Sequence, residues 1–288
     1  MEFVAKTFKY LRSSWWLIWL MCLPASVVLA FFMRPLGLVS FLPTYALSEM
    51  TGTGNFLRLH FEPLIVDSRA FIGLFIVMPI LIVITLFLTV CSVFSLIEIH
   101  FRTGRLQLKR PLSRINEYFI PTAKIFAFII VFFIIYFALI IGLNALQHNI
   151  LTGGRDVLEI YITPSVGSII TMAIITLLIF VLVCWLMAPV MFMLPFMQVY
   201  GYGFGDGLRN ATSYYAKNPF RISFGIAFIF LISIALSTVL AGLEEFLPIA
   251  VRIIISIVIQ SFTLMYFFAY CMVVSFDVAN IERRDKGV

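Results

Sequence analysis

The chain has 288 residues, of which 62% are hydrophobic and only 12% are charged, and its formal net charge is +6. Soluble domains carry about 25% charged residues, so this composition excludes a water-soluble protein of this size. The mean hydropathy of +1.08 instead predicts an integral membrane protein. The lysine and arginine residues that give the net positive charge also set membrane topology. The charge therefore does not indicate nucleic-acid binding, and we expect no nucleic-acid partner.

Six intervals free of charged residues are long enough to cross a bilayer as helices, which takes about 20 apolar residues. The predicted spans are, in chain order, Ser13–Met33, Ala70–Ile97, Ile125–Leu143, one span within Ile160–Gly205, Ile222–Leu243 and Ile253–Phe276. The predicted fold class is therefore all-α integral membrane, with six transmembrane helices in one polytopic domain over residues 1–288.

The fourth interval is longer than one span needs. Pro189 and Pro195 interrupt it, and proline breaks or kinks a helix. One interpretation is a single helix from about Ser165 that kinks at Pro189 and ends at the inner membrane surface. The alternative is that Pro189 to Gly205 forms a re-entrant segment.

The orientation of the helices follows from the positions of the basic residues. With the N-terminus inside, fifteen of the 20 Lys and Arg residues lie on the cytoplasmic side. The five on the opposite side are Arg34, Arg58, Arg69, Arg155 and Arg252. This positive-inside bias and the even number of helices predict that both termini are cytoplasmic.

Similar segments precede the first, third and fifth predicted spans. Aligning Tyr10, Tyr118 and Tyr215 places a basic or polar residue shortly after each tyrosine, followed by an apolar helix. The pattern favours three repeated units, each a short interfacial helix followed by a helical hairpin. The alternative is that any interfacial segment carries aromatic and basic residues, because both types favour that depth.

The third of these segments is the best defined. Residues Gly207–Lys217 are predicted to form a short interfacial helix, with Asp206 as its N-cap and Pro219 preventing its continuation. Leu208, Ala211 and Tyr215 would share one face of it, the pattern of a helix that lies in the interface.

The same region resembles a known family. A proline-containing helix, a glycine-rich turn, the sequence G-D-x-L and a run ending in K-N-P-x-R are similar to a group of bacterial six-helix membrane proteins. That group includes the membrane domain fused to some glycerophosphodiester phosphodiesterases. The similarity is specific only from Ala188 to Ile222, and this chain has no phosphodiesterase domain. It implies a bacterial cytoplasmic membrane and an association with lipid or envelope metabolism, but no catalytic activity.

Two sets of residues are candidates for binding. The first is the basic loop after the second span, which could contact anionic lipid headgroups. Its members are Arg102, Arg105, Lys109, Arg110 and Arg114. The second is a cavity near Gln260, Tyr266 and Tyr270 in the sixth span.

Charged residues also occur at the inner ends of two spans. Glu98, His100 and Arg102 lie at the end of the second, and Asp277 at the end of the sixth. We expect structural ion pairs there rather than a proton relay, because side chains at this depth reach water easily.

No pattern indicates catalysis, a cofactor or a metal. The alternating Gly201, Gly203, Gly205 and Gly207 do not match a nucleotide-binding loop, and no H-E-x-x-H occurs. No predicted span carries a charged residue at its centre, as ion-coupled transporters usually do. The leading hypothesis is a non-enzymatic membrane protein that acts as a lipid- or envelope-associated scaffold or as an accessory subunit of a membrane complex. The alternative is a transporter or solute-binding component for a neutral or lipid-like substrate.

Overall fold

The structure is a computed structural model, and it describes six stretches of the chain. These are residues 2–33, 77–106, 118–128, 188–197, 200–243 and 246–279, together with isolated helical positions at 130, 131, 135, 174, 178, 182 and 185. The described part is helical and contains no strand, and four of its helices are long and apolar enough to cross a membrane. The all-helical, membrane-type fold class is thereby confirmed.

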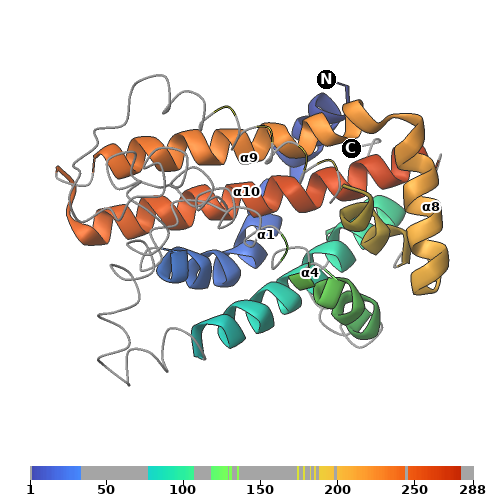
Figure 1. Ribbon diagram of the computed structural model, residues 1–288, viewed down its shortest axis with the longest axis horizontal. Coiled ribbons are helices and arrows are strands. Elements are labelled where there is room, and N and C mark those ends of the chain that lie inside the picture. Colours follow the sequence, from blue (N-terminus) through green and yellow to red (C-terminus); the bar gives the residue numbers. More distant parts are fainter. Residues whose placement is uncertain are drawn as a thin grey trace, which may run out of the picture.

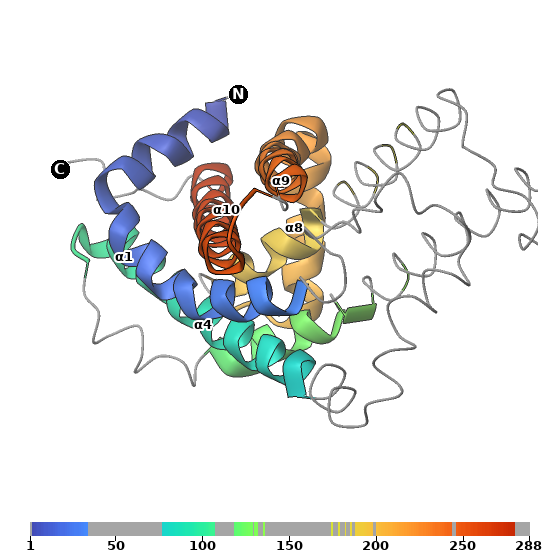
Figure 2. The same ribbon diagram turned by 90° about the vertical axis from the view of Figure 1, so that its left-hand side faces the viewer.

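The first long helix, α1 (Glu2–Met33), begins well before the predicted start at Ser13. It is bent along its length (Figure 2). Ser13 and Ser14 both donate hydrogen bonds to the carbonyl oxygen of Tyr10, at 2.9 and 3.0 Å, and such bonding bends helices. Pro24 lies further along the same helix and adds a second point of weakness.

The second long helix, α4 (Met78–Thr103), extends six residues past its predicted end at Ile97. It stops at Gly104, which has a φ of 71° and donates its backbone N–H to the carbonyl oxygen of His100 at 2.8 Å. Glycine ends helices in this left-handed conformation without steric penalty. The charged residues that follow Ile97 therefore lie on the helix itself.

The third and fourth predicted spans lie mostly outside the described residues. In this region the structure describes two shorter apolar helices. The helix Tyr118–Phe128 starts before the third predicted span and overlaps it only at residues 125–128, and the helix Ala188–Met197 lies within the fourth interval. The second passes through Pro189 and Pro195, and an irregular turn at residues 201–203 follows it. Gly201 has a φ of 66°, a conformation that favours glycine.

The short helix α8 (Phe204–Lys217) confirms that a helix forms over Gly207–Lys217, and it begins three residues earlier than predicted. It lies across the ends of the long helices (Figure 1). Ala211 and Tyr215 are buried and Leu208 is half-buried, so the predicted face is the one that packs. The buried side also includes Gly207, where an added Cβ would lie 2.7 Å from Cγ of Met197.

The prediction that Asp206 caps this helix was wrong. The N-cap is Gly203, which has extended backbone and no side-chain cap, and Asp206 lies in the first turn. The difference arises because Phe204 and Gly205 continue the helix toward the N-terminus. Asp206 is still well placed, since a negative charge in the first turn interacts favourably with the helix dipole.

Two long helices complete the described fold. α9 (Pro219–Gly242) starts with proline at its first position, which suits a helix start because the missing N–H would have no partner there. α10 (Ile249–Val278) lies beside it (Figure 1) and runs antiparallel to it, because Tyr270 contacts Ile222 whereas the earlier Phe267 contacts the later Phe230. The predicted fifth and sixth spans fall within these helices to within one residue.

The centre of the described core is α10. All its residues from Thr263 to Phe276 are buried, and α1, α4 and α9 pack around it (Figure 2). On the α1 side, Trp19 Nε1 donates a hydrogen bond of 2.8 Å to Ser261 Oγ. The last described helix is therefore the one around which the other long helices pack.

Candidate functional site

One end of the helix bundle gathers the described ion pairs. We call it the polar end and define it by Glu2 of α1, Arg102 of α4, Arg221 of α9 and Asp277 of α10. Lys6 Nζ lies 2.8 Å from Asp277 Oδ2, which joins the start of α1 to the end of α10. The start of α1 and the start of α9, together with the ends of α4 and α10, thus meet at one end.

The most deeply buried charge at the polar end is Glu98, which is 3% exposed. Its Oε2 accepts a hydrogen bond from the hydroxyl of Tyr118, and its Oε1 lies 2.9 Å from Nε of Arg102. A buried carboxylate is tolerated only when it is paired and hydrogen-bonded in this way. Both of its oxygens are engaged, and the carboxylate links α4 to the helix Tyr118–Phe128.

A second contact joins α4 to α1. His100 Nδ1 lies 3.3 Å from the hydroxyl oxygen of Tyr10, and the two rings are 5.6 Å apart. Tyr10 also packs edge-on against Phe101 at 4.8 Å. All three side chains are buried. The polar residues at the end of α4 therefore hold neighbouring helices together, in agreement with the expected structural ion pair.

A network of charges that the sequence did not predict lies on the outside of the polar end. Glu2 pairs with Lys6 at 2.8 Å, one helical turn away, and also with Arg221 of α9. The guanidinium of Arg221 and the ammonium of Lys6 both lie over the ring of Phe3, at 5.1 and 5.8 Å. The i,i+4 spacing of Glu2 and Lys6 was the only local signal, because the partners on α9 and α10 are more than 200 residues away.

Beside this end, four aromatic rings form a stack. Tyr202 stacks on Tyr200 at 5.2 Å, Tyr200 on Phe196 at 5.6 Å, and Phe196 on Tyr214 at 5.3 Å. Lys217 Nζ lies over the ring of Tyr214, 5.4 Å from its centroid. Burial raises the pKa of Tyr200 to about 12, with smaller contributions from Tyr214 and Tyr202. These rings attach α8 to the helix Ala188–Met197.

The structure describes only part of the basic loop that was predicted to contact lipid headgroups. Arg102 is half-exposed and Arg105 is exposed. The remaining members, Lys109, Arg110 and Arg114, lie outside the described residues. Since Glu98 offsets the charge of Arg102, that arginine is less available to a lipid phosphate than the sequence suggested. Contact between this loop and headgroups remains a prediction.

The three residues of the predicted cavity are all buried in α10, but only two of them lie together. Tyr266 and Tyr270 are one turn apart, and their rings stack at 5.8 Å with an angle of 13°. Gln260 precedes Tyr266 by six residues, which places it about 9 Å along the axis and about 120° around the helix. Gln260 and the tyrosine pair therefore face different neighbours.

The two tyrosines differ in how their hydroxyl groups are satisfied. Tyr270 donates a hydrogen bond of 2.9 Å to the carbonyl oxygen of Ile222 on α9. Tyr266 is 2% exposed and packs against Phe8 at 5.2 Å, and its hydroxyl has no hydrogen-bond partner among the described residues. Buried polar groups are usually paired, so Tyr266 is an exception, as are, among the described residues, the buried hydroxyl groups of Ser95 and Ser233.

Within the described part of the chain, no group of three or more His, Cys, Asp or Glu side chains lies together as a metal site would require. Comparison with known proteins adds no assignment, since no family model, curated protein or solved structure matches this chain.

Proposed function

We propose that this chain is a non-enzymatic multi-pass protein of the bacterial cytoplasmic membrane, acting as a lipid- or envelope-associated scaffold or as an accessory subunit of a membrane complex. Its partners are membrane lipids and other membrane subunits, and it uses no cofactor. The observation that carries the proposal is the burial of α10, whose residues from Thr263 to Phe276 are enclosed by other helices.

A helix enclosed in this way is suited to rigidity rather than to passage of a solute. Two of its polar side chains bond to their own helix, since Thr263 donates to the carbonyl oxygen of Ile259 at 2.8 Å and Ser275 to that of Cys271 at 2.6 Å. Such internal bonding leaves these groups unavailable to a substrate. The described ion pairs lie at the polar end, where they fix helix positions.

For the full chain we propose six spans, in three hairpin units, with both termini in the cytoplasm. The meeting of helix ends at the polar end supports this arrangement, because alternating spans must bring those ends to one side. The aligned residues Tyr10, Tyr118 and Tyr215 are nearly fully buried, at 3%, 3% and 6% exposed, and this shared burial supports the repeat.

Cysteine labelling tests the topology. Positions 110 and 217 should react from the cytoplasm and position 153 from outside. External labelling at position 110 would overturn it.

The scaffold role is tested by native mass spectrometry of the full chain after gentle extraction from its own membrane. A scaffold or accessory subunit should be released with another membrane protein in a constant ratio. Cross-linking before extraction should recover the same partner, which excludes association in detergent. A chain released alone under both conditions would contradict the role.

One observation favours the alternative, a transporter or solute-binding component for a neutral or lipid-like substrate. The buried hydroxyl of Tyr266 has no partner in the described structure and could bind a solute oxygen. Uptake into vesicles containing the purified chain should then fall with Tyr266→Phe. Because the predicted spans carry no central charge, that uptake should be insensitive to protonophores and to sodium replacement.

A further inference from the structure

The outward face of α1 combines exposed basic, aromatic and aliphatic residues in a fixed order. Lys9 and Arg12 are exposed at the polar end. Trp16, Leu20 and Val27 follow along the helix and are 54%, 50% and 37% exposed. Arg12 and Trp16 are one turn apart, as are Trp16 and Leu20, so they neighbour each other on the helix surface.

The two basic residues on this face differ from three paired cations of the polar end. Lys6 pairs with Asp277, Arg102 with Glu98, and Arg221 with Glu2. Among the described residues, Lys9 and Arg12 have no acidic partner. They are also three residues apart on one helix, close enough to act on the same anion.

The order of these side chains matches that of a phospholipid. A lysine and an arginine can both bind a phosphate, the arginine with two parallel hydrogen bonds. Tryptophan favours the depth of the headgroup and carbonyl groups. From Trp16 to Val27 the helix rises about 16 Å, which is roughly half of a hydrocarbon core of about 30 Å.

We infer that this face of α1 binds one anionic phospholipid, with its phosphate between Lys9 and Arg12, its carbonyl region beside Trp16, and its acyl chains along Leu20 and Val27. The inference deepens the proposed function and depends on its membrane location, but not on the scaffold role. It adds a site distinct from the basic loop predicted after α4. The net positive charge of the pair selects an anionic headgroup over a zwitterionic one.

Native mass spectrometry of the purified full chain, titrated with phosphatidylglycerol or with phosphatidylcholine of the same acyl chains, tests this site. The wild-type chain should prefer phosphatidylglycerol. Each basic residue removed should weaken binding about fivefold, so Lys9→Gln combined with Arg12→Gln should weaken it about 30-fold. Inorganic phosphate should not displace the lipid, because it lacks the acyl chains.

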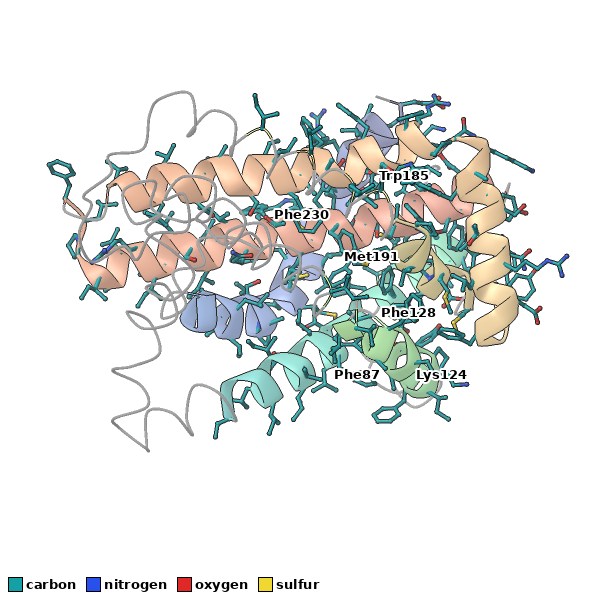
Figure 3. The ribbon with its side chains drawn as sticks, viewed as in Figure 1. Phe87, Lys124, Phe128, Trp185, Met191 and Phe230 are labelled. Carbon is teal, nitrogen blue, oxygen red and sulfur yellow. The ribbon has the colours of Figure 1, made fainter. Side chains whose placement is uncertain are left out.

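The matched control is Lys124→Gln combined with Arg209→Gln. It removes the same charge from two exposed residues, Lys124 on the helix Tyr118–Phe128 (Figure 3) and Arg209 on α8. The control should bind phosphatidylglycerol as the wild type does. A third variant, Trp16→Leu, keeps the charge and should weaken both lipids equally.

Three results would overturn the site. These are equal weakening in the two double variants, no preference of the wild type for phosphatidylglycerol, and displacement of the lipid by inorganic phosphate. Because the side chains of Lys9 and Arg12 are exposed and unpaired among the described residues, their removal should leave the thermal unfolding temperature unchanged. None of these results depends on whether another subunit is released with the chain, so the lipid site and the scaffold role are tested independently.

Discussion

The ring of Tyr270 on α10 lies directly against the backbone of Gly225 on α9. A Cβ built at Gly225 would be 2.1 Å from Cζ of Tyr270, which is closer than any real Cβ contact. The hydroxyl of the same tyrosine donates its hydrogen bond to Ile222, one turn earlier on α9. Glycine at position 225 therefore allows the two helices to approach closely, as small residues do in membrane helix packing.

We expect Gly225→Ala to destabilise the protein by about 1–3 kcal/mol, because overpacking forces helix or ring to move. Alanine favours a helix by about 1 kcal/mol over glycine, so the sign of the change depends on the clash with Tyr270. The unfolding midpoint in detergent micelles measures it. Gly205→Ala is the control, since nothing lies within 4 Å of its Cβ, and it should be neutral or stabilising. A Gly225→Ala protein as stable as the wild type would contradict the contact.

The pair of Lys6 and Asp277 should stabilise the packing of α1 on α10. The side chain of Asp277 is only 10% exposed, against 38% for Lys6, so the pair is screened less than a surface pair. A double-mutant cycle with Lys6→Gln and Asp277→Asn should give a coupling of about 1 kcal/mol. The matched cycle of Lys6→Gln with Glu2→Gln should give no measurable coupling, because the Glu2 side chain is half-exposed. Equal couplings in the two cycles would show that burial of Asp277 has no effect.

The two tyrosine contacts of α4 should differ in strength. Tyr118 donates to the buried carboxylate of Glu98, whereas Tyr10 lies 3.3 Å from a ring nitrogen of His100. Removing a donor from a buried charged group costs about 1.5–3 kcal/mol, against about 0.5–1.5 kcal/mol for an average hydrogen bond. Tyr118→Phe should therefore destabilise the protein more than Tyr10→Phe in chemical unfolding. In a Glu98→Gln background the effect of Tyr118→Phe should become smaller. An unchanged effect would place its cause outside this hydrogen bond.

The position of Asp206 in α8 leads to a test of how it acts. Asparagine is as good an N-cap as aspartate, so Asp206→Asn would have no effect if the side chain were the cap. Because Gly203 is the N-cap, only the charge of Asp206 is expected to act, through the helix dipole. Asp206→Asn should then destabilise α8 by about 0.3–1 kcal/mol, less so at high salt. Hydrogen exchange of the α8 amides measures the change, and a salt-independent loss would argue against the dipole.

Local patterns in the sequence were enough to predict the helices but not all their ends. The first span was predicted to start at Ser13, just after Arg12, and the second to end at Ile97, just before Glu98. In the structure α1 and α4 continue through these charged residues. A helix does not stop at the membrane surface, because long charged side chains reach water while the backbone stays helical. The stop at Gly104 depends on backbone conformation, which hydropathy does not report.

Local sequence patterns also predicted only part of the candidate site. The sequence placed Glu98 and Arg102 at one helix end and identified Tyr266 and Tyr270 as polar residues within a span. It could not reveal that Tyr118 reaches Glu98 or that Gln260 faces a different neighbour from Tyr266. The hydroxyl of Tyr118 and the carboxylate meet through the packing of two helices, which no local spacing encodes.

The amino-acid sequence by itself determined the membrane character of this chain, the all-helical fold and the presence of α8. Each depends on composition or on periodicity within one segment, so neighbouring residues are sufficient to specify it. Only the tertiary structure decided that α10 is the central helix, that Lys6 meets Asp277, and that Gly225 receives the ring of Tyr270. These contacts join residues far apart in the chain, and they form only where the side chains of several helices fill the same space at once.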